Sequence, residues 1–250
     1  MKKCEHCNET YPDEYSFCPI CGKPFTDKNN PLYWSEIARS ARVRGDIQAA
    51  IEACKNCERI DGKNAHTFFV LGSLYYFSGE IKKSIDYFEK SIKFSPKDAD
   101  TYYYLGISLY RNGSIKASIK CLKKCLELNP DFIIAYYWLG ITYYHKGERN
   151  ESIRAFNKLL DINPESIIAH YHIGVSLSSV GKYKEAIPHF ETVKDAGHEN
   201  EAVLYHLGVA YFRAGNFPLS IENFKKSIEL NPDDDRSEKM LDFMLNVPKI

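Results

Sequence analysis

The chain has 250 residues, 44% of them apolar, and equal numbers of basic and acidic side chains. This balance favours neither nucleic acid nor an anionic membrane surface. No apolar run reaches the roughly 18 residues of a membrane helix, and the N-terminus lacks the apolar stretch of a signal peptide. We therefore expect a cytoplasmic protein without a membrane partner. Its eight cysteines should be thiols or metal ligands, with a secreted disulfide framework as the alternative.

Two Cys-x2-Cys pairs mark residues 1–25 as a separate domain: Cys4 with Cys7, and Cys18 with Cys21. Two tight turns that each present two thiolates complete a tetrahedron around a metal ion. So short a segment cannot build a sufficient core, so the metal must supply the folding energy. The segment resembles a short N-terminal zinc ribbon, which implies one structural Zn²⁺. Four thiolate ligands leave no open position for a substrate.

Iron and nucleic acid give the alternative interpretations of this segment. The stretch "CPICG" also resembles a rubredoxin knuckle, which would imply an iron-binding electron-transfer module, but rubredoxins separate their knuckles by a much longer segment. Zinc ribbons often contact nucleic acid, which would make the chain a nucleic-acid-associated adaptor and requires a basic face. Residues 1–30 contain four lysines against five acidic residues, which disfavours this alternative.

Helical periodicity begins after a linker at residues 26–30, where Asn30 can cap a helix and Pro31 can occupy its first turn. From there the sequence repeats every 34 residues. One glycine ladder comprises Gly72, Gly106, Gly140, Gly174 and Gly208, and a second comprises Gly45, Gly79, Gly113, Gly147, Gly181 and Gly215. The period defines six frames: 31–64, 65–98, 99–132, 133–166, 167–200 and 201–234.

Each frame contains two stretches with helical periodicity around the second glycine, which permits a left-handed turn between them. Each frame is therefore a helical hairpin. We expect the first-ladder glycine to let the two helices approach against a small residue of the second helix, which is Ala50, Ser84, Ser118, Ser152, Ala186 or Ser220. A bulky residue follows four positions later, at Phe88, Leu122, Phe156, Phe190 and Phe224.

This pattern of aromatic, Leu-Gly, Tyr, small residue, Phe and Pro resembles the tetratricopeptide repeat. The resemblance covers residues 31–234 and implies an all-α fold, a right-handed superhelix of six helical hairpins. The first repeat departs from it at Ala38 and Cys54, and the fifth at His170 and His198. Residues 235–250 are interpreted as a C-terminal capping helix and tail, as an open-ended repeat array needs.

A further stripe on the first helices should face the concave side of such a superhelix, because its members recur at steps of three and four. We expect this stripe to form a partner-binding groove that captures an extended or helical peptide segment. The groove residues are Phe69, Tyr76, Tyr103, Ile107, Tyr110, Tyr137, Ile141, Tyr144, Tyr171, Val175, Tyr205 and Phe212. The asparagine places of the family's carboxylate clamp hold Ser, Ile or Val here, which disfavours a partner with an acidic C-terminal tail.

The remaining cysteines and histidines receive structural interpretations. Cys54, Cys57, Cys121 and Cys125 lie on second helices, where a free cysteine packs as a small apolar residue. His172 and His206 occupy equivalent places in neighbouring repeats, so their rings could come close. Without a third ligand, we interpret this as a chance contact on the surface and not as a metal site. No nucleophile elbow or phosphate loop is present. The sequence therefore predicts a non-catalytic scaffold that binds a protein or peptide partner, with the zinc ribbon as a second contact module.

Overall fold

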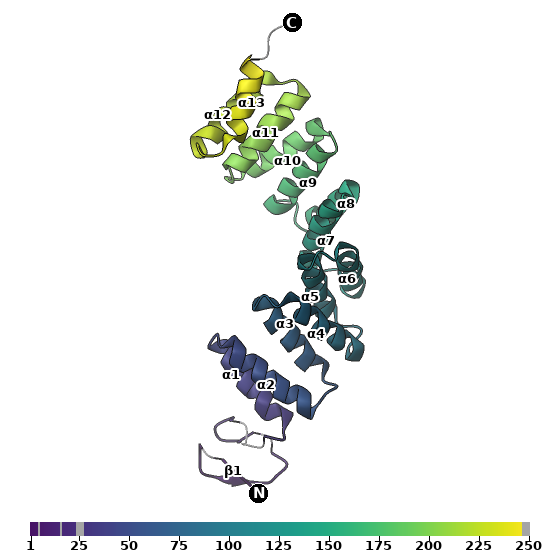
Figure 1. Cartoon of the computed structure of the whole chain (residues 1–250), viewed down its shortest axis with the longest axis vertical. Helices are drawn as coiled ribbons and strands as arrows, with labels where there is room; N and C mark the ends of the chain where they lie inside the picture. Colours follow the sequence, from purple (N-terminus) through teal and green to yellow (C-terminus); the bar gives the residue numbers. More distant parts are fainter. Residues whose placement is uncertain (5, 16, 24–27, 247–250) are drawn as a thin grey trace. The chain divides into compact units, whose positions relative to one another are not determined.

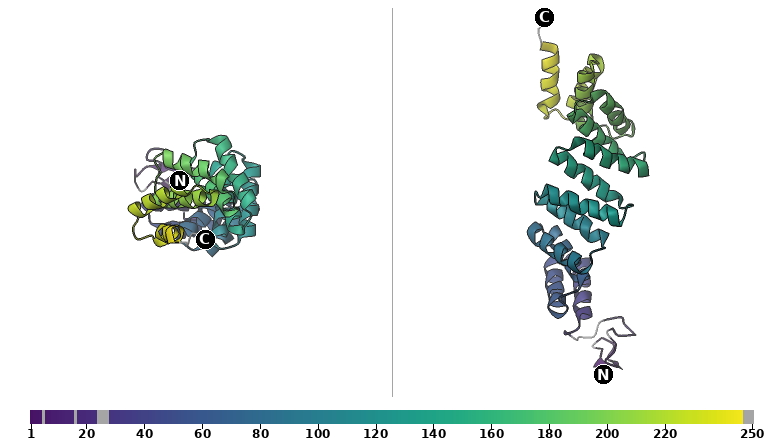
Figure 2. Two further views of the ribbon diagram at one scale, coloured as in Figure 1. Left: turned by 90° about the horizontal axis from the view of Figure 1, so that it is seen from above. Right: turned by 90° about the vertical axis from the view of Figure 1, so that its right-hand side faces the viewer.

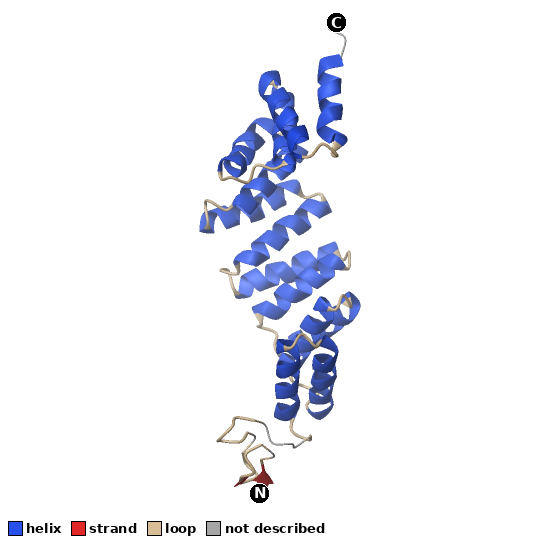
Figure 3. Ribbon diagram, turned by 90° about the vertical axis from the view of Figure 1, so that its left-hand side faces the viewer, coloured by secondary structure: helices blue, strands red, loops and turns tan. Residues whose placement is uncertain are grey.

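The computed structural model describes residues 1–4, 6–15, 17–23 and 28–246 (Figure 1). Residues 5, 16, 24 and 25 of the expected ribbon, residues 26 and 27 of the expected linker, and the expected tail at 247–250 lie outside the described residues. The described part contains one small antiparallel sheet, in which β1 (Lys2–Lys3) pairs with β2 (Thr10–Tyr11), and is otherwise helical (Figure 3). Within that part, no helix combines the length and apolar content that crossing a membrane requires.

The helices alternate with short turns along the chain. They are α1 (Pro31–Val43), α2 (Ile47–Ile60), α3 (Ala65–Phe77), α4 (Ile81–Phe94), α5 (Ala99–Arg111), α6 (Ile115–Leu128), α7 (Ile133–Lys146), α8 (Arg149–Ile162), α9 (Ile167–Ser179), α10 (Tyr183–Asp195), α11 (Glu201–Ala214), α12 (Phe217–Leu230) and α13 (Asp235–Asn246). Each 34-residue frame contains one odd-numbered and one even-numbered helix, which pack against each other. The expected helical hairpins are therefore present.

The chain forms two compact units, residues 1–130 and 131–250. The N-terminal unit contains both strands and α1 to α6, and the C-terminal unit contains α7 to α13. Within each unit, the second helix of one hairpin also packs against the first helix of the next. Each unit thus has its own core of stacked hairpins.

Polar side chains and glycines set the ends of these helices. Asn30 accepts a hydrogen bond from the backbone N–H of Leu32, and Pro31 occupies the first helical position, as the sequence predicts. Gly147 ends α7 with a φ of 91°, a left-handed conformation that glycine adopts without a steric penalty. The following residues can then reverse direction and begin α8.

The first-ladder glycines face bulky side chains of the second helix. A Cβ atom added at Gly140 would lie 2.6 Å from Cζ of Phe156, and one added at Gly72 would lie 2.7 Å from the ring of Phe88. An added Cβ atom would thus first meet the bulky side chain, but the predicted small residue also opposes the glycine in the sixth repeat, where Ser220 Oγ donates to the carbonyl oxygen of Gly208 at 2.8 Å. The bulky residue lies one helical turn further along the second helix. Its side chain fills the space that a side chain of the glycine position would otherwise occupy.

Two small residues of the second helices also contact the next hairpin. Ser84 Oγ and Ser108 Oγ lie 3.1 Å apart across α4 and α5, and Ser152 Oγ lies 3.2 Å from Ser176 Oγ across α8 and α9. All four residues are buried. Their small size permits close approach of consecutive hairpins, and each hydroxyl pair satisfies its own hydrogen-bonding needs away from water.

The first hairpin has neither the glycine nor the bulky residue. Ala38 stands in the glycine's place and Cys54 in that of the ring, and both are buried. The two departures compensate, because the small thiol leaves room for the methyl group of Ala38. They also leave space, since both residues line a cavity of about 250 Å³.

Replacing Ala38 by glycine and Cys54 by phenylalanine, singly and together, should show that the two substitutions have a coupling energy in the free energy of unfolding. Cys54→Phe alone is expected to destabilise the N-terminal unit by about 1–3 kcal/mol, because the new ring would meet the Ala38 methyl group. Ala38→Gly alone should cost about 1 kcal/mol in helix propensity. The double variant should be more stable than the sum of the two changes predicts, as measured by urea unfolding. Additive effects would contradict the compensation.

Helix α13 packs on α12 and α11 at the end of the C-terminal unit (Figure 2). Leu241 and Ser237 are buried in this contact, and Ser237 Oγ lies 2.9 Å from Ser227 Oγ. Phe243 is 56% exposed, and its ring centroid lies 6.1 Å from that of Phe212. One face of α13 thus covers the last hairpin, while the other faces solvent.

Candidate functional site

The cysteines of the two Cys-x2-Cys pairs come together in one cluster. The sulfur atoms of Cys4 and Cys21 are 3.7 Å apart, those of Cys7 and Cys18 are 3.8 Å apart, and all four lie within 4.8 Å of one another. A tetrahedron with metal–sulfur bonds of about 2.3 Å has edges of about 3.8 Å. The cluster can therefore hold a metal ion in tetrahedral coordination, and all four thiols are free.

Both pairs are shaped by the same backbone hydrogen bonds. The N–H of Asn8 donates to the carbonyl of Cys4, and the N–H of Gly22 donates to that of Cys18, each at 2.8 Å. Asn8 and Gly22 both have a positive φ, which closes each turn tightly. The two turns are thus equivalent, and each presents its two sulfur atoms to the same point.

The environment of Cys18 favours the thiolate form. Burial raises the pKa of this thiol, but hydrogen bonds from the backbone N–H groups of Cys21 and Ile20 stabilise the thiolate and lower the pKa to about 6. A thiolate is the form that binds a metal ion. His6 is exposed and lies near Lys23, with Nδ1 3.3 Å from Nζ, and is not among the residues of the cluster.

The four other cysteines lie on second helices. Cys54, Cys57 and Cys125 are buried, and Cys121 is half-buried. Burial raises the pKa of Cys54 and Cys125 to about 12 and that of Cys121 to about 11. These thiols therefore stay protonated at neutral pH and pack as apolar groups.

In the N-terminal unit, the expected groove residues are partly accessible. Phe69, Tyr76, Tyr103 and Tyr110 are half-buried, whereas Ile107 is only 4% exposed and offers little surface to a partner. Phe69 lines a pocket of about 360 Å³ together with His66 and Asp100. The side chain of Arg111 lies over the ring of Tyr76, 4.8 Å from its centroid.

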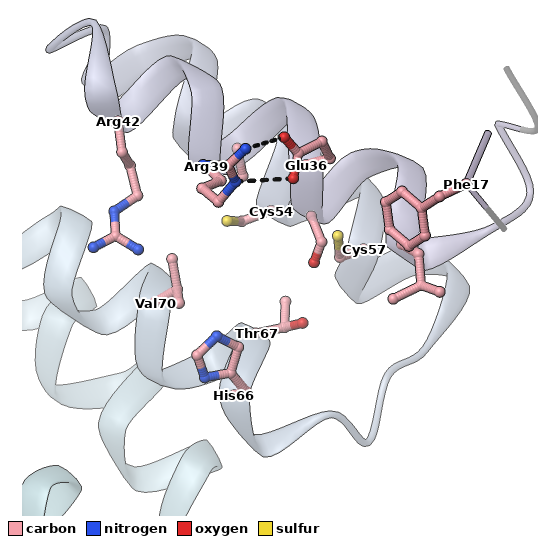
Figure 4. Close-up of a pocket in the computed structure, with 12 residues that line it drawn as sticks. Phe17, Glu36, Arg39, Arg42, Cys54, Cys57, His66, Thr67 and Val70 are labelled. Carbon is pink, nitrogen blue, oxygen red and sulfur yellow. Dashed lines mark hydrogen bonds and ion pairs between the residues drawn. The ribbon is translucent and has the colours of Figure 1, made fainter. Parts of the chain in front are cut away.

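The cavity of the first hairpin opens beside this stripe, between α1, α2 and α3 (Figure 4). Its apolar wall includes Ala38, Cys54, Cys57 and Val70, and polar groups of Arg39, Arg42, His66 and Thr67 surround it. Glu36 holds Arg39 through two hydrogen bonds. Figure 4 shows Arg42 extending from α1 towards α3, where Val70 and His66 lie.

In the C-terminal unit, all the expected groove residues are half-buried: Tyr137, Ile141, Tyr144, Tyr171, Val175, Tyr205 and Phe212. Tyr137 and Tyr171, from consecutive hairpins, line one pocket of about 310 Å³. Ile168, which is 58% exposed, and His198 contribute to the same pocket. Aliphatic and tyrosine side chains of two consecutive hairpins therefore line one hollow.

The stripe tyrosines also support the core. The ring of Tyr171 lies edge-on to Phe190, with 6.2 Å between centroids, and to His206 of the next hairpin, at 5.9 Å. Tyr137 has the same relation to Phe156 and His172. One edge of each ring thus packs inside the unit while the other lines the pocket.

His172 and His206 do not pair as expected. His172 stacks on Phe156 at 5.0 Å between centroids, and His206 stacks on Phe190 at 5.3 Å. Each imidazole lies between hairpins and takes the place that Tyr104 has over Phe88. Burial lowers the pKa of both histidines to about 4, so both rings are neutral at pH 7.

The neutral His206 makes the stability of the C-terminal unit depend on pH. Burial, and then the charge of Arg236, lower its pKa to about 4, whereas an unfolded histidine titrates near 6.5. The unfolded state therefore binds more protons between these values. The contribution of His206 is complete above pH 6.5 and is lost towards pH 4, by about 1.4 kcal/mol per pH unit. His206→Tyr, which copies the Tyr104 stack, should flatten the dependence of urea stability on pH, and an unchanged slope would contradict this account.

The sequence analysis did not include one set of pocket-lining residues, which lie six positions before each first-ladder glycine, or before Ala38 in the first repeat. Their places hold Leu32, His66, Asp100, Ile134, Ile168 and Ala202, all of which line pockets except Ile134. They lie one turn before the stripe residues on the same helix face, so a further step of three would have found them.

Comparisons with known proteins agree with this architecture. Models described as "TPR repeat" and "Tetratricopeptide repeat" match residues 72–113 and 108–147, 133–166, and 202–234. No curated protein matches the chain. Among solved structures, MamA is 30% identical with a TM-score of 0.62, over 64% of this chain and 93% of that chain. MamA from Desulfovibrio magneticus RS-1 is 24% identical with a TM-score of 0.64, over 68% and 94%. YrrB is 19% identical with a TM-score of 0.69, over 77% and 99%.

The stacked hairpins with a glycine against a bulky side chain define a helical repeat solenoid. The chain belongs to the tetratricopeptide repeat family. Proteins of this family are typically non-catalytic scaffolds for protein–protein interaction. YrrB is described as a TPR protein with an unusual peptide-binding site.

Proposed function

We propose that this protein is a non-catalytic scaffold that binds a peptide segment of a partner protein along the first-helix stripe. The observation that carries the proposal is the pocket of about 310 Å³ where Tyr137, Tyr171 and Ile168 converge. This volume is near the lower end for pockets that hold small ligands, and suits one large side chain of a peptide. The peptide-binding site named for YrrB supports the same use of the fold.

The chemistry of this pocket favours an apolar anchor residue. Ile168 and the ring faces of the two tyrosines supply the apolar contact, and burial of an aliphatic or aromatic side chain there would contribute about 1.5–3 kcal/mol. The tyrosine hydroxyls and Asn200 offer hydrogen bonds to a peptide backbone at the rim. An anchor residue with polar groups on either side fits this arrangement.

The N-terminal unit provides a second pocket with a different preference. Arg42 and His66 lie at the cavity of the first hairpin, and Glu36 already neutralises Arg39. Within the described residues, no carboxylate pairs with Arg42. We assign this pocket to a side chain with an acidic group, and not to a terminal carboxylate, because the clamp residues are absent.

The proposal includes a zinc ribbon in residues 1–25, six repeats in residues 31–234 and a capping segment in residues 235–250. Cys4, Cys7, Cys18 and Cys21 would hold one structural zinc ion. Zinc is favoured over iron by the short separation of the two pairs, and all ligand positions are filled by thiolates. Elemental analysis and visible absorbance of the purified protein test this choice, since an iron tetrathiolate absorbs visible light and zinc does not.

Peptides selected from a random display library provide the test of the groove. The affinity of each selected peptide is measured for the wild type and for Tyr137→Ala combined with Tyr171→Ala. We expect the double variant to bind at least tenfold more weakly, because the apolar walls of the pocket are lost. Tyr183→Ala is the matched control, since Tyr183 starts a second helix outside the stripe.

The outcome separates the two roles of the tyrosines. Circular dichroism must first show that every variant keeps its helices. Equal affinity of the folded double variant and the wild type would mean that these tyrosines serve packing alone. Loss of affinity in Tyr183→Ala as well would place the binding site elsewhere.

A further inference from the structure

Two histidines of the fifth repeat face each other within one hairpin of the C-terminal unit. His170 lies on α9 and His189 on α10. Their Nδ1 atoms are 2.9 Å apart, and their ring centroids are 5.1 Å apart. Both side chains are partly buried. Neither residue lines the peptide pockets described above, so the proposed function does not account for the pair.

The hydrogen bonds fix which nitrogen of each ring carries a proton. Nε2 of His170 lies 3.0 Å from the carbonyl oxygen of Pro164, so this nitrogen carries a proton and donates it. The neutral ring then has a lone pair on Nδ1. The Nδ1–H of His189 donates to that lone pair. The two nitrogens thus share one proton between them.

The equivalent places of the second repeat show that the fold does not need histidines here. Phe68 and Tyr87 occupy these two positions, with 6.4 Å between their ring centroids. A hairpin therefore folds without a nitrogen atom at either place. Among the six repeats, only the fifth has a histidine at both.

We propose that His170 and His189 form a binding site for a divalent cation of the kind that imidazole prefers, such as Zn²⁺. The cation would take the place of the shared proton and coordinate both Nδ1 atoms, while the proton of His189 moves to its Nε2. Two bonds of about 2.1 Å at a tetrahedral angle span about 3.4 Å. The present separation is 2.9 Å, so small rotations of the two rings suffice.

Two further features favour metal binding. The hydrogen bond from His170 to the Pro164 carbonyl is the type of contact that orients a metal-bound histidine and raises its basicity. Burial, and then the neighbouring His170, lower the pKa of His189, so protons compete weakly with the cation at neutral pH. Water would fill the remaining coordination positions, since no acidic or cysteine ligand joins the pair among the described residues. We therefore expect an exchangeable site and not a closed structural one.

Zinc titration of the full chain tests the site. The cysteine cluster is first saturated with Zn²⁺, and further Zn²⁺ is then added at pH 7.5 under calorimetric detection. The wild type should bind one additional equivalent, and His170→Phe and His189→Phe should each lose it. His198→Gln should keep it, because His198 is an exposed histidine of the same unit.

A second measurement makes the test independent of the variants. Nitrogen-15 spectra of the imidazoles should show that the additional Zn²⁺ shifts the Nδ1 resonances of His170 and His189, with the Nε2 of His189 gaining a proton. An additional equivalent that survives in both phenylalanine variants, or shifts at other histidines, would overturn the proposal. Absence of any additional equivalent in the wild type would do the same.

Discussion

Gly140→Leu is expected to destabilise the C-terminal unit by about 3 kcal/mol, at the upper end of typical overpacking costs. The first carbon of any side chain at this position would lie 2.6 Å from Cζ of Phe156, which is fully buried. Even alanine, which gains about 1 kcal/mol in helix propensity over glycine, should give no net stabilisation. Urea unfolding followed by circular dichroism measures the change.

A second substitution identifies the cause of this loss. Phe156→Ala alone should destabilise by about 3–5 kcal/mol, because it opens a cavity beside Gly140. In the double variant, the leucine can occupy the space of the lost ring, so the two losses should not add. Strict additivity would show that the ring and the glycine do not limit each other. Leucine at the exposed Asn157 serves as the control for helix propensity.

Cys18→Ser is expected to abolish metal binding and the order of residues 1–23, while the helices keep their circular dichroism signal. Among its described residues, the segment is held by one two-residue strand pair, the cysteine cluster and a few turn and surface contacts. Metal binding contributes about 10–16 kcal/mol to the folding of comparable zinc peptides, so its loss exceeds what the segment can replace. The metal content per chain and the helical signal are the two measurements.

Cys57→Ser is the matched control for this variant. Cys57 forms a Cys-x2-Cys pair with Cys54 that lies on helix α2, outside the N-terminal cluster. Cys57 is buried, and its sulfur lies 3.3 Å from the Pro31 carbonyl oxygen. This variant should keep the full metal content. A large loss of helical signal in Cys18→Ser would show that the segment is integrated with the repeats, for which the contact of Phe17 with the first-hairpin cavity offers a route.

The repeat architecture could be predicted from the sequence because it is encoded many times over. The two glycine ladders and the aromatic positions each report the same period, so errors at single residues such as Ala38 do not matter. The convergence of the four N-terminal cysteines followed from their spacing for the same kind of reason. Two tight turns have few ways to present four sulfur atoms.

Contacts between helices were harder to predict, because they depend on a rotation of the helix that periodicity does not fix. The sequence shows that a glycine, a small residue and a ring recur together. It does not show that Phe156 turns towards Gly140 while Ser152 turns towards Ser176. Ser152 and Phe156 are four residues apart, so their side chains leave the helix within about 40° of each other, and the pattern alone does not assign one contact to each.

The histidines illustrate the same limit. His172 and His206 are separated by one repeat, and their pairing was inferred from that separation alone. The structure instead places each ring on the phenylalanine of the preceding hairpin. His170 and His189 are 19 residues apart in the same repeat and meet across its two helices, as Phe68 and Tyr87 do in the second repeat. Only the packing of α9 on α10 brings them together.

The alanine and cysteine of the first hairpin imply an order in which substitutions can accumulate. In a hairpin with a glycine and a ring, alanine in place of the glycine meets the ring and gains nothing in stability. The gain of Ala38 is therefore easier after loss of the ring, and return of the ring is then costly until the alanine has reverted. Each substitution thus makes reversal of the other less favourable, which helps to keep an open cavity in the first repeat, whereas a bulky side chain fills the glycine hollow in the five others.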